Sequence, residues 1–192
     1  GDGGNRKAHG CGMGLDWGIH LLDQALRIGE GRKLISVYAE LTNVTNEECD
    51  DGFRVTLIFE GDLSMYVEVT TSNFIELPRW YILGENGSAV INDWDLNGEI
   101  VKVSDWENRD AVPILAGVGL TKTMAPRTDD TIKHYPLPKV DSSWTQFYEN
   151  VFAALRGEEE QLITHDQQRR LLKLVDAIFE SGNENKVVFF DK

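Results

Sequence analysis

Three polar side chains near the start of the chain have residue types and a spacing that suit acid–base chemistry. Asp16, His20 and Asp23 follow one another at intervals of four and three residues. On a helix this spacing places two carboxylates and an imidazole on one face. An imidazole has a pKa suited to proton transfer near neutral pH, and a carboxylate one turn before it could orient or charge-stabilise it. The pattern predicts work on a hydroxylated substrate, with His20 as the first candidate, Asp16 as the second and Asp23 as a structural residue.

Two other interpretations of this helical face stay open from the residues alone. The face could be structural, with His20 ion-paired to a neighbour. It could also hold a divalent metal, but three ligands from one helix rarely converge on one ion and no fourth ligand is evident, so we expect no metal. His9, in the loop before the helix, could contact the substrate.

The glycines around this segment invite a second hypothesis, a dinucleotide-binding loop. The G-x-G-x-x-G fingerprint that begins at Gly10 requires a third glycine where the chain has Leu15, and residues 1–9 do not form the buried strand that should precede it. We therefore expect no cofactor-binding residue in this chain. Gly12, Gly14 and Gly18 are predicted to be structural glycines, which let another backbone or a neighbouring group approach closely.

The elements that must position these residues follow from periodicity. A glycine-rich loop is expected over residues 1–14 and an amphipathic helix over 15–28. From residue 33 the period changes to two, which predicts an antiparallel meander. Its strands are expected at residues 34–41, 53–59, 63–69, 80–83, 88–92 and 99–103. Residues 104–141 are predicted to be an irregular excursion. Capping boxes at residues 143–146 and 164–167 predict two helices, ending at Gly157 and Gly182, before a last strand at 186–190.

Together these elements predict an α+β fold. We expect an open, largely antiparallel β-sheet of about six or more strands, covered on one face by three helices. The formal charge of −13 argues against nucleic acid and anionic membrane surfaces as partners, and no apolar run is long enough to span a bilayer. The two cysteines, Cys11 and Cys49, occur in unrelated contexts, which favours a reducing cytoplasm over a disulfide scaffold.

The segment from Gly10 to Asp23 resembles a motif of a known family. G-C-G-M-G-L-D-W-G-I-H-L-L-D is similar to the G-G-G-x-x-x-D-x-G-x-H-x-x-D segment of the Gfo/Idh/MocA oxidoreductases, the family of glucose-fructose oxidoreductase and inositol dehydrogenase. Cys11 stands where that family often has glycine. Residues 51–55, 87–91 and 177–181 are also family-like, and the predicted order of elements resembles the family's C-terminal domain.

The resemblance implies that residues 1–192 form the C-terminal, substrate-binding and oligomerisation domain of an NAD(P)-dependent dehydrogenase. Such an enzyme acts on a CH–OH group of a sugar, cyclitol or related polyol. The family's N-terminal Rossmann domain binds NAD or NADP and carries a catalytic lysine in an E-K-P motif. Nothing in this chain matches that domain, so we expect the chain alone to be inactive and to bind no cofactor tightly.

The resemblance also assigns expected roles and partners. Asp16 and His20 are expected to share proton transfer and the binding of a small polyhydroxylated substrate. The Rossmann domain of the parent chain and a second copy, bound through the open sheet face, are the expected protein partners. The alternative is a non-catalytic dimerisation or binding module that keeps the fold, because a fold does not by itself confer activity.

Overall fold

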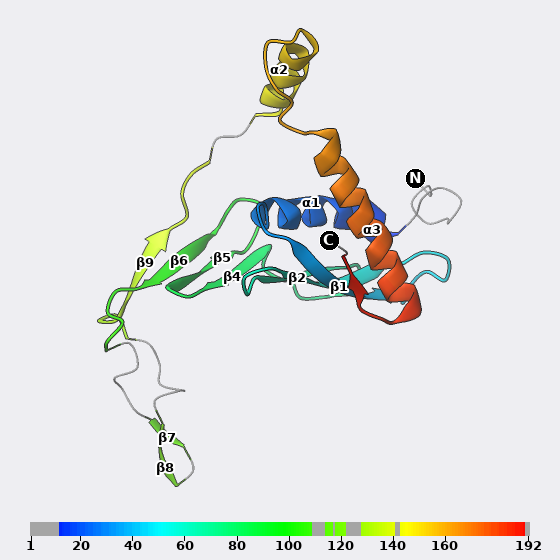
Figure 1. The fold of residues 1–192 in the computed structure, drawn as a ribbon. Coiled ribbons are helices and arrows are strands. Elements are labelled where there is room, and N and C mark those ends of the chain that lie inside the picture. The colour runs from blue at the N-terminus through cyan, green and yellow to red at the C-terminus, as the bar shows by residue number, and fades with distance from the viewer. Residues whose placement is uncertain (1–11, 109–113, 117, 122–127, 141–142, 191–192) are drawn as a thin grey trace. The chain divides into compact units, whose positions relative to one another are not determined.

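The computed structural model describes residues 12–108, 114–116, 118–121, 128–140 and 143–190, and the chain divides into two compact units (Figure 1). The first unit consists of Gly1–Phe74 together with Ser143–Lys192, and the second consists of Ile75–Ser142. The first unit contains the segment that carries Asp16 and His20.

The first unit is built from one sheet and its helices. Its helical elements are η3, a π-helical turn at Gly14–Gly18, followed by α1 (Ile19–Ile28), α2 (Trp144–Leu155) and α3 (His165–Glu184). Its strands are β1 (Leu34–Thr42), β2 (Gly52–Phe59), β3 (Ser64–Thr70) and β10 (Val188–Phe189). They form an antiparallel sheet in the order β10-β1-β2-β3. The last strand therefore pairs with the first one, at the edge of the sheet.

The second unit is a separate antiparallel sheet. Strands β4 (Trp80–Gly84), β5 (Gly87–Ile91), β6 (Gly98–Val103) and β9 (Ile132–Pro136) are hydrogen-bonded in that order. A two-stranded ribbon, β7 (Ile114–Ala116) with β8 (Gly119–Thr121), lies between β6 and β9 in the chain. The Asn-Gly turn signals at residues 86–87 and 97–98 do connect consecutive strands, as predicted.

The core of the first unit lies between its sheet and helices α1 and α3. Every second side chain of β2 is buried, as the alternation in the sequence predicts, namely Phe53, Val55, Leu57 and Phe59. The helices contribute Leu22, Ala25 and Leu26 from α1, and Leu174, Val175, Ala177 and Ile178 from α3. A buried hydroxyl joins the layers: Ser181 accepts a hydrogen bond from the Ala39 amide at 2.8 Å and donates one to the Lys186 carbonyl at 2.6 Å.

These observations confirm the α+β class with open antiparallel sheets, and they refine its details. The strands divide between two four-stranded sheets instead of forming one sheet. Helices α1 and α3 cover the apolar face of the first sheet. Helix α3 packs extensively against β1, whereas α2 makes no comparably extensive contact with any other described element. Strand β9 lies inside the segment that was expected to be irregular. The alternation of its residues is weak, and the strand forms because it pairs with β6.

Two helix boundaries differ from the prediction for physical reasons. The first helical stretch begins with a π-turn, whose hydrogen bonds span one residue more than those of an α-helix and change the phase of the apolar stripe. Leu15 is accordingly 36% exposed, whereas Leu22 is buried. Helix α3 continues past Gly182 to Glu184, and Asn185, with a left-handed backbone, caps its end. Gly182 is instead a packing residue, since a Cβ there would lie 2.6 Å from the Leu41 side chain.

Cys49 corrects one expectation about the cysteines. It is disulfide-bonded, not a free thiol. The other cysteine of the chain, Cys11, lies outside the described residues. Separately, none of the described helices is both long and apolar enough to cross a lipid bilayer.

Candidate functional site at the start of helix α1

The two leading candidate side chains lie at the start of the first helical stretch. Asp16 belongs to η3 and His20 to the first turn of α1, and both side chains are exposed. The Asp16 amide donates a hydrogen bond to the Gly12 carbonyl oxygen at 3.1 Å, which ties this backbone to the residues before it. The structure thus presents a carboxylate and an imidazole, four residues apart, at a solvent-accessible surface.

The third polar residue of the predicted face has a different environment. The Asp23 carboxylate accepts a hydrogen bond from Arg27 Nε at 2.9 Å, one turn further along α1. Pairs of this kind on an exposed helical surface contribute a few tenths of a kcal/mol. Asp23 is therefore engaged by a cation of its own helix, while His9, the other candidate for substrate contact, lies outside the described residues.

Asp50, which the sequence analysis did not single out, binds the start of the helical segment. Its Oδ2 accepts a hydrogen bond from the Gly14 amide at 2.7 Å, and its carbonyl oxygen accepts one from the Met13 amide at 3.0 Å. Unpaired amides at a helix start favour a carboxylate in this position. Burial raises the pKa of Asp50, although the hydrogen bond from Gly14 acts in the opposite direction. Asp50 thus anchors the segment that carries Asp16 and His20.

The glycines of the motif are explained by the groups that approach them. A Cβ at Gly12 would lie 1.9 Å from Asp50 Oδ1, and its φ of +113° is itself disfavoured for other residues. A Cβ at Gly14 would lie 3.3 Å from Asp50 Oδ2. At Gly18 it would lie 2.5 Å from the ring of Phe53, a core residue of β2. These glycines allow a carboxylate and an aromatic ring to come close to the helix backbone.

This geometry also tests whether the glycine segment could hold the phosphates of a dinucleotide. A dinucleotide loop offers its glycine amides and a helix start to phosphate oxygens. Here the Gly14 amide already donates to Asp50, and the Asp50 carboxylate fills the space beside Gly12. A second anion at this position would meet the negative charge of Asp50. The described residues of this segment therefore do not fit a pyrophosphate.

Asp51, the next residue in the chain, stabilises the loop that positions Asp50. It is 6% exposed, and its carboxylate accepts hydrogen bonds from the Thr42 hydroxyl at 3.2 Å, from the Thr45 hydroxyl at 3.0 Å and from the Thr45 amide. Burial favours the neutral form of Asp51, but these hydrogen bonds outweigh burial and lower its pKa to about 2. The sequence signals for this pair of aspartates are Asp50-Asp51-Gly52 at the start of a predicted strand and the family-like stretch at residues 51–55.

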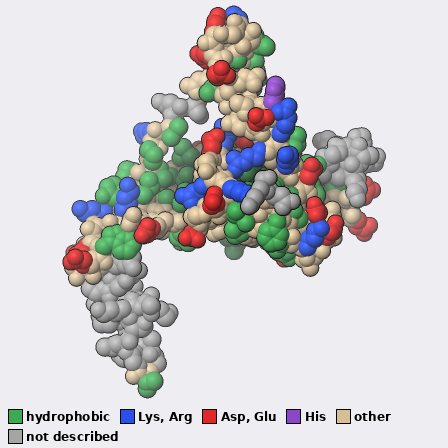
Figure 2. All heavy atoms as spheres, viewed as in Figure 1, with side chains coloured by type: hydrophobic (Ala, Val, Ile, Leu, Met, Phe, Trp, Pro, Cys, Tyr) green, Lys and Arg blue, Asp and Glu red, His purple; other side chains and the backbone are tan. Residues whose placement is uncertain are grey.

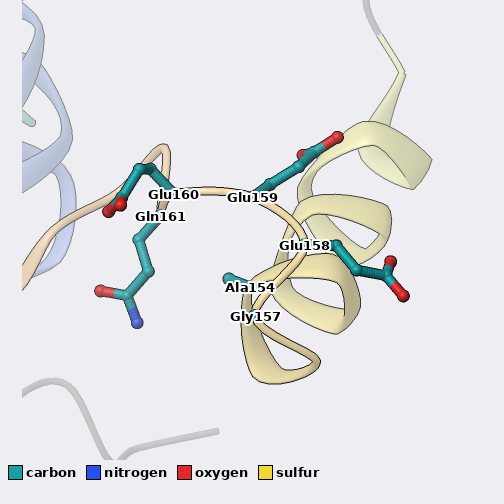
Figure 3. A pocket seen from close by; sticks show the side chains of 6 residues that line it. All are labelled: Ala154, Gly157, Glu158, Glu159, Glu160 and Gln161. Carbon is teal, nitrogen blue, oxygen red and sulfur yellow. The ribbon is translucent and has the colours of Figure 1, made fainter.

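A surface depression at the end of α2 is a weaker candidate site. Its volume is about 490 Å³, and it is lined by Ala154, Gly157, Glu158, Glu159, Glu160 and Gln161. The three carboxylates point in different directions (Figure 3). Glu158 is paired with Arg156, and Glu159 accepts a hydrogen bond from Asn150. The depression therefore lacks a convergent set of polar groups, and within the described ranges no group of three His, Cys, Asp or Glu residues could hold a metal ion.

One further histidine has a charged partner, in the second unit. His134 Nδ1 lies 2.7 Å from Glu99 Oε2 across the β6–β9 pairing, with both side chains about half exposed. The hydrogen bond to Glu99 raises the pKa of His134. This pair lies on the open surface of a sheet, which favours a cross-strand ion pair over a catalytic arrangement.

Comparison with known proteins adds the family. Residues 2–90 match the model of the GFO/IDH/MocA C-terminal domain. The chain is 41% identical to an NAD-binding protein from Listeria innocua, with a TM-score of 0.88 over 99% of this chain and 55% of that one. No curated protein matches the chain.

Two more distant solved structures share the fold alone. The yvaA protein of Bacillus subtilis is 16% identical, with a TM-score of 0.75 over 100% of this chain and 54% of that one. The WlbA dehydrogenase of Bordetella pertussis, solved with NADH and UDP-GlcNAcA, is 19% identical, with a TM-score of 0.60 over 94% of this chain and 46% of that one. The chain spans about half the length of the structures it matches.

Fold, motif and comparisons agree on the class of protein, a C-terminal domain of the kind found in NAD-binding oxidoreductases. Within that class, residues 2–90 match the C-terminal domain of the Gfo/Idh/MocA family, which the chain resembles.

Proposed function

We propose that the chain is the substrate-binding and oligomerisation domain of an NAD(P)-dependent oxidoreductase that acts on a CH–OH group of a sugar, cyclitol or related polyol. The observation that carries the proposal is the exposed pair Asp16 and His20, on a helical segment whose start is anchored by Asp50. The match to an oxidoreductase family supports it. The pair forms one wall of a cleft, and the nucleotide-binding domain of the parent chain forms the other.

In this mechanism the chain handles the substrate hydroxyl and its proton. The nicotinamide, when bound, accepts or supplies the hydride. The His20 imidazole takes the hydroxyl proton when the alcohol is oxidised and returns it in the reverse direction. Asp16 carries a negative charge four residues away, which stabilises the imidazolium and orients the substrate hydroxyl. The exposure of both groups supports this proposal, since a polyol must reach them directly.

The proposal is tested on the full-length parent by substituting His20. His20→Ala is expected to lower kcat by about 100-fold or more, as for the loss of a general acid–base group. Asp16→Asn is expected to raise KM, because an amide replaces the charged acceptor that would bind the substrate hydroxyl. The matched control is His134→Ala, an exposed histidine of the second unit. Unchanged turnover in folded His20→Ala protein would favour the non-catalytic module instead.

We propose that NAD or NADP is bound by the parent's N-terminal domain and not tightly by this chain. This proposal is supported by the hydrogen bond from the Gly14 amide to Asp50, because that amide is then not available to a phosphate. Titration of the isolated chain with NADH, followed by fluorescence or calorimetry, should give no saturation in the low-micromolar range. Saturation there would contradict the proposal and would require a phosphate site in the chain.

The proposed oligomer forms through the outer face of the first sheet, where Tyr66 is 60% and Ile58 is 39% exposed. These apolar side chains flank the Arg54–Glu68 ion pair, in which Nε and Oε1 are 3.1 Å apart. Such a mixture of apolar and paired polar groups is typical of an interface. Light scattering of the parent should give a dimer or larger assembly at micromolar concentration, and Ile58→Asp should dissociate it. A monomeric parent would contradict the proposal.

The cytoplasmic location is likewise proposed, on the basis of the family and the acidic composition of the chain. The Cys49 disulfide argues against this location, since cytosolic thiols are generally kept reduced. Fractionation of the source cells, with detection of the parent protein, is the direct measurement.

A further inference from the structure

Helix α2 exposes its apolar face and buries a polar residue, the reverse of an ordinary surface helix. Trp144 is 89%, Tyr148 59%, Phe152 59% and Leu155 78% exposed. Their spacing of four, four and three residues places them on one face of the helix. Phe147, 42% exposed, packs edge-on against Tyr148 with ring centroids 5.3 Å apart. We refer to these five side chains as the α2 surface, and Figure 2 shows hydrophobic side chains at the surface of this region.

The other face of α2 is already occupied by the chain that follows it. Asn150 is 7% exposed and donates hydrogen bonds to Glu159 Oε2 at 3.1 Å and to the Glu160 carbonyl at 2.9 Å. Its side-chain oxygen accepts a hydrogen bond from the Leu162 amide at 3.0 Å. The linker to α3 is thereby fastened to the face opposite the α2 surface, so it does not cover the aromatic side chains.

A helix in this condition needs a partner. α2 has 12 residues, a length at which an isolated helix is marginal in water. The Ser143 cap and the Asn150 hydrogen bonds give local support, but helices in proteins owe most of their stability to the burial of an apolar face. The buried side chains of α3 begin only at Leu174, so the first turns of α3 extend beyond the core as well. Helix α2 therefore presents an apolar face that is exposed among the described residues and is suited to binding another domain or chain.

The available area distinguishes between the possible occupants. With aromatic side chains worth about 150–250 Å² each, the α2 surface presents roughly 500 Å². That is less than the ~800 Å² per partner of a standard dimer but fits an interface between domains of one chain. About half the length of the solved relatives lies outside the part that this chain matches, which provides a body of suitable size.

We propose that the α2 surface is the docking site for the N-terminal nucleotide-binding domain of the same parent chain. This inference rests on the proposed function insofar as the parent has such a domain. It assigns α2 a task distinct from that of α1. The aromatic side chains of α2 hold the two domains together, so that the wall carrying Asp16 and His20 keeps its position relative to the cofactor.

The test compares hydrogen exchange of α2 in the full-length parent and in the chain of 192 residues. The α2 amides should exchange at least about tenfold more slowly in the parent, because docking suppresses local opening. Phe152→Glu should abolish that difference and lower the melting temperature of the parent, while leaving the melting of this chain unchanged. The matched control is Phe74→Glu, a fully exposed aromatic residue outside α2.

Three outcomes would overturn the inference. The first is equal α2 exchange in both proteins, and the second is an equal effect of Phe152→Glu on both. The third is protection of α2 in the isolated chain that grows with protein concentration, which would assign the surface to a second copy. None of these readouts uses activity. A parent with a protected α2 and no dehydrogenase activity would therefore refute the proposed function and leave the docking site standing.

Discussion

Asp51→Asn should destabilise the first unit through the loss of one buried charge. The carboxylate of Asp51 accepts hydrogen bonds from two threonine hydroxyls and one backbone amide, and the side chain is 6% exposed. Its pKa falls from 3.8 to about 2. Since one pKa unit corresponds to 1.36 kcal/mol, nearly two units amount to about 2 kcal/mol of folding free energy at neutral pH. An asparagine keeps the size but offers one acceptor oxygen in place of two.

The pH dependence distinguishes this charge effect from a simple loss of packing. A carboxyl group whose pKa is lowered on folding stabilises the native state above its unfolded pKa, and the contribution disappears as the pH falls through the folded value. The difference between native protein and Asp51→Asn should therefore be constant above about pH 5 and shrink between about pH 4 and pH 2. Stability below that range should be the same for both proteins.

Urea unfolding followed by circular dichroism at a series of pH values measures both quantities. Asp176→Asn, which replaces an exposed carboxylate on α3, is the matched control and should change stability by less than about 0.5 kcal/mol. The reasoning fails if Asp51→Asn stays within that margin at pH 7. It also fails if a full loss of about 2 kcal/mol persists unchanged at pH 3, since the loss would then come from packing and not from charge.

Three further predictions address the glycine motif, the ion pair of the second unit and the disulfide. Gly18→Ala should lower the unfolding free energy by about 1–3 kcal/mol, because its Cβ would lie 2.5 Å from the Phe53 ring, and a stabilised variant in urea would refute the close contact. NMR titration of His134 should give a raised pKa that falls in Glu99→Gln; an unchanged titration would show that the pair does not form in solution. Since the pKa of His134 is raised on folding, its contribution is present at acidic pH and is lost as the pH rises through the folded value. Iodoacetamide should label Cys49 only after reduction, and labelling of the unreduced protein, detected by mass spectrometry, would contradict the disulfide.

Much of the local structure was predictable from the sequence. The capping box at Thr164 and Gln167 is present with both hydrogen bonds, at 3.2 and 2.9 Å. The hairpin between β2 and β3 turns at Gly61 and Asp62, both with positive φ. Such signals act over two to four residues, so the sequence pattern contains all that is needed to recognise them. Strand β9 has no such signal, because its alternation is weak and its stability comes from pairing with β6.

The sequence by itself determined the family-like motif, the α+β class and the helix that carries Asp16 and His20, because periodicity and residue type are local properties of the chain. Only the tertiary structure decided that Asp50 anchors the start of that helix, since the Asp50–Gly14 hydrogen bond joins residues 36 positions apart. It also decided the purpose of the glycines, which make room for Asp50 and for the ring of Phe53. A glycine in a sequence shows that space is needed, but the group that fills the space is known only once distant segments have packed together.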